Sequence, residues 1–348
     1  MNQPGTFIQE KYIINVLLRH ASFIDNIGLM NGKMGIAIFF FHLGKMMKIQ
    51  VYEDYAEELV DDIYQKIGTT IIPMDFENGL AGVAWGIEHL VHNGFIEADT
   101  DEILSDLDDK IFQHLTNSVG LSISVENGLL GYGFYLLSRL RNKDLKKNVD
   151  HNFILKRLLI DLINCLYETI EEKEEVLIEP VTFKITWSLP LTLILLSEIR
   201  RLNIYNRKID IILNRLSHIT LSRFPMKQAN KLFLLTGMQA ILKQADLKGW
   251  HEHFRLLKDT LDADEILREF PDKNIMVSDG LGGITLIAKL LEDANKESAL
   301  LQLSSKIAEK IVRSACWKSF EGKDKLNAKN LGILDGLSGI GYSLLGIF

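Results

Sequence analysis

A short glycine-centred element recurs along the chain, and this repetition constrains the fold more than any other feature. Each copy reads Asn or Asp, Gly, two residues and then Gly, and an apolar stretch follows it. Five copies are clear, at residues 31–35, 78–82, 127–131, 279–283 and 335–339. A unit that recurs about every 20–50 residues marks a protein built of stacked structural repeats. The sequence therefore predicts one repeating architecture rather than unrelated domains.

The long interval between the third and fourth clear copies has room for two degraded ones. They are Trp187-Ser188-Leu189-Pro190 and Leu235-Thr236-Gly237. Together with the clear copies they give seven markers, which are Gly32, Gly79, Gly128, Ser188, Gly237, Gly280 and Gly336. The spacing of roughly 50 residues is enough for two helices and two loops. The chain is therefore predicted to contain seven helical hairpins.

The two helices of each hairpin have different apolar patterns. The stretch after each glycine element, such as 36–43 or 340–348, is apolar nearly all round, which is typical of a helix buried on every side. The segments between them are amphipathic, as in 52–67. Because the chain ends on an apolar stretch instead of a polar capping repeat, the last inner helix should pack against the first. We predict an all-α fold, a closed α/α toroid with inner and outer helix layers, as a single domain over residues 1–348.

The glycines and the residues before them have expected structural roles. Glycine lets backbones approach closely and adopts conformations that other residues avoid. Asn or Asp before it is a preferred N-cap, whose side-chain oxygen accepts a free N–H of the first helical turn. We expect both roles at the end of the ring where the inner helices begin.

Composition excludes several classes of function. The net charge is -7 and no long run of Lys or Arg occurs, which argues against a nucleic-acid partner. The most apolar stretch, 34–43, is far shorter than the roughly 20 residues needed to cross a bilayer. With no secretory signal at the N-terminus, a cytoplasmic protein without a membrane partner is expected. Cys165 and Cys316 are isolated in the sequence and are expected to be buried free thiols.

Seven such elements in one chain, with residues 78–83 and 335–340 among the clearest, resemble the lanthionine synthetase C-like family over essentially the whole length. The resemblance implies an α/α toroid with a zinc ion at the mouth formed by the inner-helix N-termini. In that family zinc activates a peptide cysteine as thiolate. The thiolate adds to dehydroalanine or dehydrobutyrine and closes a thioether ring, which requires a metal with an open coordination position.

The positions that correspond to the family's zinc ligands carry other residues here. The Trp-Cys-Tyr-Gly motif of the fourth unit falls on Trp187, Ser188 and Leu189, so serine replaces the ligand cysteine. The Cys-His-Gly motif of the fifth unit falls on Leu235, Thr236 and Gly237. Serine and threonine are poor zinc ligands beside thiolate and imidazole, and leucine has no donor atom. The resemblance therefore implies a zinc-free member, with neither metal nor cofactor.

Other residues that the resemblance marks as functional are also changed. The family's arginine before the first zinc cysteine falls on Lys184, and its histidine in the third unit falls on Asn127. The acidic residue before the second unit's glycine persists as Asp75. Asp75 is therefore the candidate catalytic residue.

The mouth is predicted to be acidic and partly aromatic. Acidic residues precede the inner helices, and Phe76, Phe183 and Trp187 are expected to line the same opening. Such a mouth suits a short basic or apolar peptide. The candidate binding residues are Phe76, Glu77, Glu126, Asn127, Lys184, Trp187, Ser188 and Thr236.

Three hypotheses of function follow. The first is a zinc-free relative of the lanthipeptide cyclases that binds a peptide substrate or leader peptide and assists its modification, with a peptide dehydratase as a partner. The second is an active cyclase with a non-standard or metal-free site, in which Asp75 is the base. The third is a carbohydrate-active toroid, a hydrolase or lyase, in which Asp75 and Glu126 are the paired carboxyl groups.

One histidine cluster is set apart from this mouth. Glu88, His89 and His92 share a helical face late in the second inner helix, at the other end of the barrel. We interpret them as a polar helix end in solvent and not as a metal site.

Overall fold

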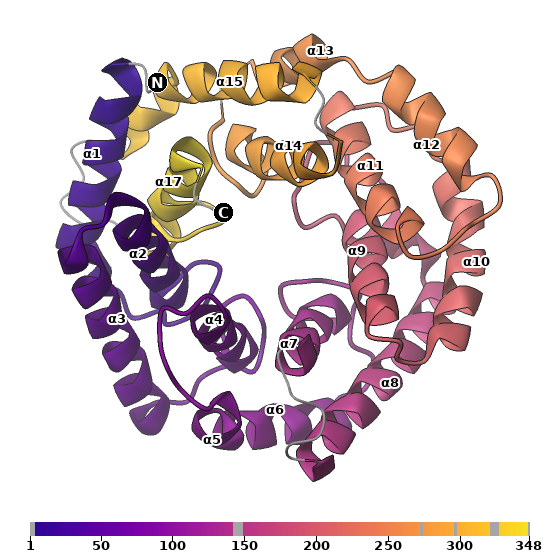
Figure 1. Cartoon of the computed structure of the whole chain (residues 1–348), viewed down its shortest axis with the longest axis horizontal. Coiled ribbons are helices and arrows are strands. Elements are labelled where there is room, and N and C mark those ends of the chain that lie inside the picture. Colours follow the sequence, from indigo (N-terminus) through magenta and orange to yellow (C-terminus); the bar gives the residue numbers. More distant parts are fainter. Residues whose placement is uncertain (1–3, 142–148, 272–273, 296–297, 321–326, 347–348) are drawn as a thin grey trace.

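The structure is a computed structural model, and it describes residues 4–141, 149–271, 274–295, 298–320 and 327–346. These residues form a ring of helices in two concentric layers, and none of them is in a strand (Figure 1). The inner layer comprises α2 (Lys33–Met47), α4 (Leu80–His92), α7 (Leu129–Arg141), α9 (Ser188–Arg201), α11 (Gln228–Leu242), α14 (Leu281–Asn295) and α17 (Leu337–Leu345). The outer layer comprises α1 (Pro4–His20), α3 (Gln50–Thr69), α6 (Ser105–Asn117), α8 (Val149–Glu172), α10 (Asn206–Ser222), α12 (Trp250–Asp259) and α15 (Ser298–Val312). Shorter helical segments are α5 (Thr100–Ile103), α13 (Ala263–Arg268), α16 (Ala328–Leu331), η1 (Ala21–Phe23), η2 (Glu174–Leu177) and η3 (Ala315–Ser319). The predicted all-α toroid is confirmed.

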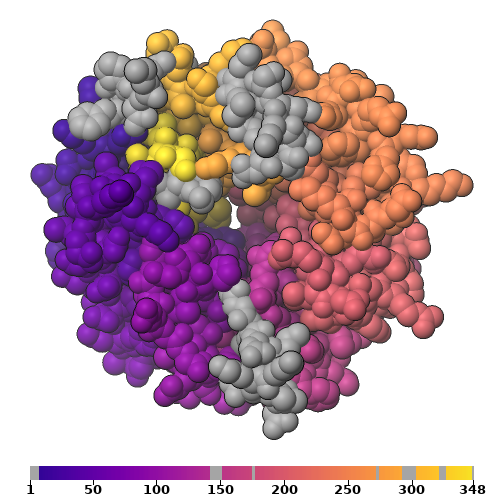
Figure 2. Space-filling model, viewed as in Figure 1, coloured from indigo at the N-terminus to yellow at the C-terminus, as the bar shows by residue number. Residues whose placement is uncertain are grey.

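The ring is closed by the last inner helix. α17 lies between α14 and α2 and also packs on α1 (Figure 1). The Tyr342 ring meets the Phe39 ring edge-on, with centroids 5.5 Å apart. Gly341 allows this approach, because a Cβ there would lie 2.7 Å from Phe39 Cε2. The space-filling view shows a narrow hollow at the centre of the ring (Figure 2).

The two layers bury their side chains as the apolar patterns predict. In α2 the consecutive residues Phe39, Phe40 and Phe41 are all buried, because this helix is surrounded by the outer layer and its inner neighbours. Outer helix α3 buries only one stripe, which includes Leu59 and Ile63. Among the described residues, no helix has both the length and the apolar character needed to cross a bilayer.

Backbone hydrogen bonds tie the loops before the inner helices to one another. Five of these loops each offer a carbonyl oxygen to N–H groups of another loop, and the acceptors are Met30, Glu77, Glu126, Ser278 and Leu334. Glu126 O, for example, accepts from Phe76 N and Glu77 N, both at 2.9 Å. Glu77 O in turn accepts from Met30 N at 2.9 Å. The loops therefore form a hydrogen-bonded rim at one end of the barrel. Among the described residues no such backbone bond joins the third loop to the fourth, and the fifth unit takes no part in it.

The rim also crosses the point where the chain ends meet. Met30 O accepts from Ile333 N at 2.7 Å and from Leu334 N at 3.1 Å, which joins the first unit to the last. Leu334 O accepts from Ser278 N at 2.9 Å, and Ser278 O accepts from Ile185 N at 2.8 Å. Closure of the toroid is therefore fixed by backbone bonds as well as by apolar packing.

The second glycine of each element is required for space. A Cβ at this position would meet the carbonyl oxygen six residues earlier, at 2.1 Å for Gly82 and 1.8 Å for Gly339. The loop thus folds back onto the first turn of its own inner helix. The first glycine, as in Gly79 (φ -115°), has extended backbone that any residue adopts. An unusual conformation is therefore not its role, and this part of the sequence-based expectation is wrong.

At the elements before α2, α4 and α17, the Asn or Asp before the glycine does not act as the expected N-cap. Gly32, Gly79 and Gly336 are the N-cap residues, and none of these caps has a side-chain hydrogen bond. Asn31 Nδ2 instead donates to Glu77 Oε1 of the next loop at 2.9 Å. Asn78 Oδ1 accepts from the Asn26 amide at 2.6 Å. These side chains reinforce the rim instead of capping their own helices.

The fifth unit departs from the repeat. α11 starts at Gln228 without a glycine loop, so Gly237 lies inside the helix and not before it. Its first N–H groups are satisfied from a distant segment, since the Glu269 carboxylate accepts from Gln228 N at 2.7 Å and Ala229 N at 3.0 Å. The markers therefore do not all precede their helices, which corrects the sequence-based expectation for this unit.

A buried ionic cluster joins three neighbouring helices. Arg139 on α7 and Asp108 on α6 are fully buried, and Arg139 Nη2 lies 2.5 Å from Asp108 Oδ2. Arg139 also pairs with Glu88 on α4, and Tyr135 donates to Asp108. Burial by itself would raise the pKa of Asp108, but hydrogen bonding to His151 and the charge of Arg139 lower it overall. Arg139 therefore links the inner helices α4 and α7 to the outer helix α6 by charge.

We expect Arg139→Ala to lower the free energy of unfolding by about 3–5 kcal/mol, because Asp108 and Glu88 would be left buried without their cation. Urea denaturation followed by circular dichroism measures this difference. Arg268→Ala is the control, since Arg268 is exposed and pairs with Glu265 on the surface. The control should change stability by less than about 1 kcal/mol. Equal losses of unfolding free energy in the two variants would show that the buried cluster stabilises the fold no more than an exposed ion pair does.

Gly339→Ala should destabilise the chain by about 1–3 kcal/mol or more, because its Cβ would overlap the Ile333 carbonyl that the rim holds in place. Gly68→Ala is the matched control, since nothing lies within 4 Å of a Cβ there. Gly68 lies in helix α3, so alanine should stabilise it by about 0.5–1 kcal/mol. Thermal unfolding of both variants tests the pair, and opposite signs are expected.

Candidate functional site

Asp75, the candidate catalytic residue, holds its own loop together. Its Oδ1 accepts the N–H of Asn78 at 2.7 Å, at the turn that leads into α4. Tyr132 on α7 is close by: burial raises the pKa of Tyr132 to about 12, and the Asp75 carboxylate adds to this rise. The carboxylate is therefore half-buried and partly committed to folding the turn. The pairing of Asp75 with Glu126 as the carboxyl groups of a glycoside hydrolase stays a prediction.

Four of the polar binding candidates lie in the loops of the rim. Glu77 Oε1 accepts from Asn31, and Glu126 uses its backbone oxygen in the rim while its side chain is half-buried. Asn127 is exposed, and its Oδ1 accepts from Ser124 Oγ at 2.8 Å. Lys184 is also exposed, in the loop before α9. These side chains mix both charges at the mouth and are available to a ligand only in part.

The aromatic lining that the sequence suggested is not present in that form. Phe76 is 6% exposed and Trp187 is 4% exposed. Trp187 Nε1 donates to Leu177 O at 3.2 Å, and its ring packs against Phe233 of α11. Phe183 is also buried against Phe233. These rings fill the space between helices, because burying their apolar surface is more favourable in free energy than exposing it at an opening.

The hydroxyls of Ser188 and Thr236 are directed to different partners. Ser188 Oγ donates to Ile123 O of the third loop at 2.6 Å, whereas Thr236 Oγ1 donates to Leu232 O of its own helix at 3.0 Å. Gly237 on α11 lies against the Pro190 backbone, since a Cβ there would be 2.9 Å from Pro190 Cα.

A zinc ion of the family type does not fit these residues. The Ser188 hydroxyl is buried and hydrogen-bonded to a carbonyl, the Thr236 hydroxyl is bonded within its helix, and Leu235 has no donor atom. In the part of the chain that the structure describes, no three His, Cys, Asp or Glu side chains are grouped so that they could hold a metal ion.

The loop before α9 passes over the start of α11, which the sequence did not suggest. Asn230 Nδ2, in the first turn of α11, donates to Glu179 Oε1 at 2.8 Å and to Pro180 O at 3.0 Å. Further along the same loop, Ile185 N reaches Ser278 O of the sixth unit. The fourth loop therefore spans the fifth unit and binds the sixth. The only feature of the sequence that indicates this crossing is the missing glycine element before α11.

The cluster of Glu88, His89 and His92 at the other end of the barrel differs from the predicted polar helix end in solvent. Glu88 is buried and paired with Arg139, so it is not part of a solvated helix end. His89 Nε2 lies 2.9 Å from His42 Nε2 of α2, and the Trp85 ring stacks on His89. Burial lowers the pKa of both His42 and His89 to about 4, with smaller effects from Lys45 on His42 and from His42 and His92 on His89. Sequence reasoning missed His42, which is brought to His89 only by the neighbouring α2 and α4.

The two imidazoles predict a loss of stability in acid. The unfolded histidines titrate near 6.5 and the folded ones near 4, so the unfolded state binds more protons between these values. The free energy of unfolding should therefore fall as the pH falls from about 6.5 to about 4. The double variant His42→Gln, His89→Gln should show a shallower fall in urea denaturation over this range. His218→Gln, on an exposed site of α10, should keep the slope of the unmodified chain.

Comparisons with known proteins support a relationship to one family. The family model described as lanthionine synthetase C-like protein matches residues 24–184, which is less than half of the chain. No curated protein matches. Nine chains of solved structures match, among them nisin cyclase, with a TM-score of 0.68 and 14% sequence identity. That match covers 97% of this chain and 92% of nisin cyclase, so the two share the toroid fold.

The family match stops close to where the repeat becomes irregular. The match ends at Lys184, immediately before Trp187 and the fourth and fifth units. These are the units whose loop and helix start depart from the repeat in the structure. The sequence similarity that the family model detects therefore lies in the part of the ring before Trp187.

Proposed function

We propose that this chain is a lanthionine synthetase C-like protein that binds a peptide and assists its modification in ribosomal peptide biosynthesis, without a zinc centre of its own. The matched family model and the fold shared with nisin cyclase support the family. The peptide-binding role rests on the rim, whose partly exposed acidic side chains suit a basic peptide.

One observation carries the zinc-free part of the proposal. Ser188, which occupies the position of the first zinc cysteine, has its hydroxyl on the Ile123 carbonyl. This bond joins the fourth unit to the third and contributes to the rim. A residue in this position serves the architecture of the mouth and not the activation of a thiol.

A metal-free cyclase is the less favoured alternative. It would need a base that reaches the thiol of a bound peptide. Asp75 is the candidate, but its Oδ1 already accepts the Asn78 N–H. Peptide binding, with a dehydratase or another modifying enzyme as the partner that performs the chemistry, makes fewer demands on these residues.

The proposal predicts that the purified chain holds no stoichiometric zinc and leaves the cysteines of a dehydrated peptide unreacted. Elemental analysis measures the metal, and thiol alkylation with mass spectrometry counts the remaining free thiols. Nisin cyclase with its own substrate is the positive control for ring closure. One tightly held zinc per chain, or loss of peptide thiols that requires this chain, would contradict the proposal.

A further inference from the structure

A groove runs along the outer wall between α6 and α8. It has a volume of about 440 Å³ and lies under the loop that follows α6. Its lining residues come from α6, this loop, the first residue of α7 and one face of α8.

The floor of the groove is apolar. Leu115 and Leu121 approach it from one side, and Leu158 and Leu162 approach it from α8. Val119 stands on its edge and is 97% exposed. The groove and Val119 therefore offer apolar surface that a bound molecule could cover.

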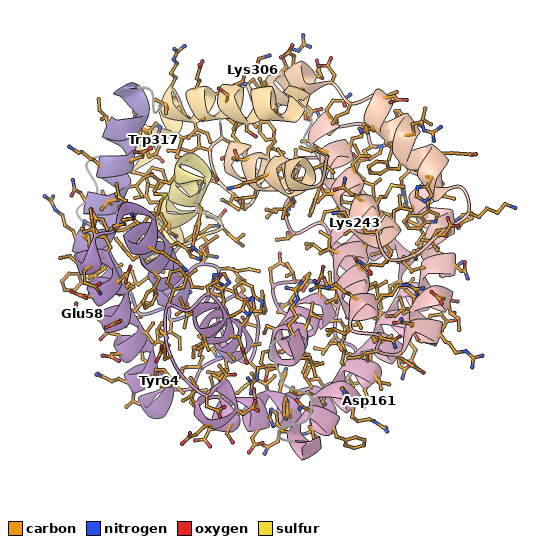
Figure 3. The ribbon with its side chains drawn as sticks, in the orientation of Figure 1. Glu58, Tyr64, Asp161, Lys243, Lys306 and Trp317 are labelled. Atoms are coloured by element: carbon orange, nitrogen blue, oxygen red, sulfur yellow. The ribbon has the colours of Figure 1, made fainter. Side chains whose placement is uncertain are left out.

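One edge of the groove is acidic. Asp161, Glu168 and Glu172 line it, and all three are exposed. With Cys165 between them they follow spacings of four, three and four residues, which place them on one face of α8. Asp161 is visible on the outer layer in Figure 3. The described lining contains no Lys or Arg.

Two further observations concern these carboxylates. Burial raises the pKa of the Cys165 thiol, and the charges of Glu168 and Asp161 add to the rise, so both acids act on the groove. The Asp161 carboxylate pairs with Arg157 at 3.1 Å on the surface, an exposed pair that contributes little. Cys165 is exposed, which corrects the expectation that it is buried.

The groove leads directly to the mouth. The wall segment 118–121 continues into Ile123, whose carbonyl accepts the Ser188 hydroxyl, and then into Glu126 of the rim. Leu129, the first residue of α7, belongs to the groove lining. A chain seated in the groove would therefore reach the rim within a few residues at about 3.3 Å per residue.

We propose that this groove docks a segment of the peptide partner in which apolar side chains alternate with Lys or Arg. Apolar side chains would cover the leucine floor and Val119, and cations would pair with Asp161, Glu168 and Glu172. The acids would repel the phosphates of a nucleic acid or an anionic membrane. The inference rests on the proposed function, because it assigns to the peptide a second contact outside the mouth.

The test uses a short fluorescein-labelled peptide of alternating leucine and lysine and the full chain. Fluorescence anisotropy measures its binding, and a peptide of alternating leucine and glutamate is the ligand control. The double variant Glu168→Lys, Glu172→Lys should weaken binding at least about tenfold at low salt, because it places like charges opposite the peptide. The matched control is Glu57→Lys, Glu58→Lys on outer helix α3, where Glu58 lies on the far wall (Figure 3). This control changes the net charge equally and should retain the affinity.

Cys165 provides an independent readout of position. Bound peptide should slow the alkylation of Cys165 by iodoacetamide and leave Cys316 unaffected, as mass spectrometry of the tryptic peptides would show. Binding without protection of Cys165, or equal weakening by both double variants, would overturn the inference.

A third variant, Glu126→Lys, separates this inference from the proposed function. If this mouth substitution abolishes binding while the groove substitutions have no effect, the groove assignment is wrong and the peptide-binding function stands. If the peptide does not bind the unmodified chain, the groove assignment is wrong, and the zinc and thiol measurements decide the proposed function separately.

Discussion

The hydrogen-bonded rim is the constraint on which the rest of this structure depends. Inner helices that converge on one axis leave free N–H groups at their N-termini and free carbonyls in the loops before them. Here the carbonyls of one loop accept from the N–H groups of another, so neighbouring units satisfy each other's backbone. The bond from Ile333 to Met30 joins the ends of the series. The loops of six units are joined in this series, and the fourth loop spans the fifth unit.

The rim also accommodates the units in which the repeat is irregular. The second glycines hold the loops against their helices, and the bond from Ser188 to Ile123 joins the third and fourth units. At the fifth unit the glycine loop is missing, and the fourth loop crosses the start of α11 to reach the sixth unit. The Glu269 carboxylate satisfies the helix end that the missing loop leaves. The rim is therefore preserved by different contacts in the two units that differ most from the family's pattern.

The two ends of the barrel use charge differently. At the mouth, polar side chains form hydrogen bonds between exposed loops. Water competes for these bonds, and a ligand can replace the water. Near the other end, Arg139 is enclosed with its acidic partners, and His42 faces His89 with both rings held neutral by burial. Charges that are buried in this way fix neighbouring helices in one register. The outer groove at α8 combines the two situations, with an apolar floor and exposed acids.

The sequence by itself determined the all-α toroid, its two layers, its seven units and its closure. These follow from local signals, since the glycine elements recur in the chain and apolar periodicity reports burial of a helix on one or all sides. Tertiary structure decided the site. Nothing near Asn31 or Asn78 in the sequence indicates that they bond between loops, and nothing near Gln228 indicates that Glu269 caps its helix. The aromatic residues Phe76 and Trp187 have the same identity whether they line an opening or fill a wall, and only their neighbours place them in the wall. Sequence periodicity reports which face of an element is buried, whereas the partner of each polar group depends on elements that are distant in the chain.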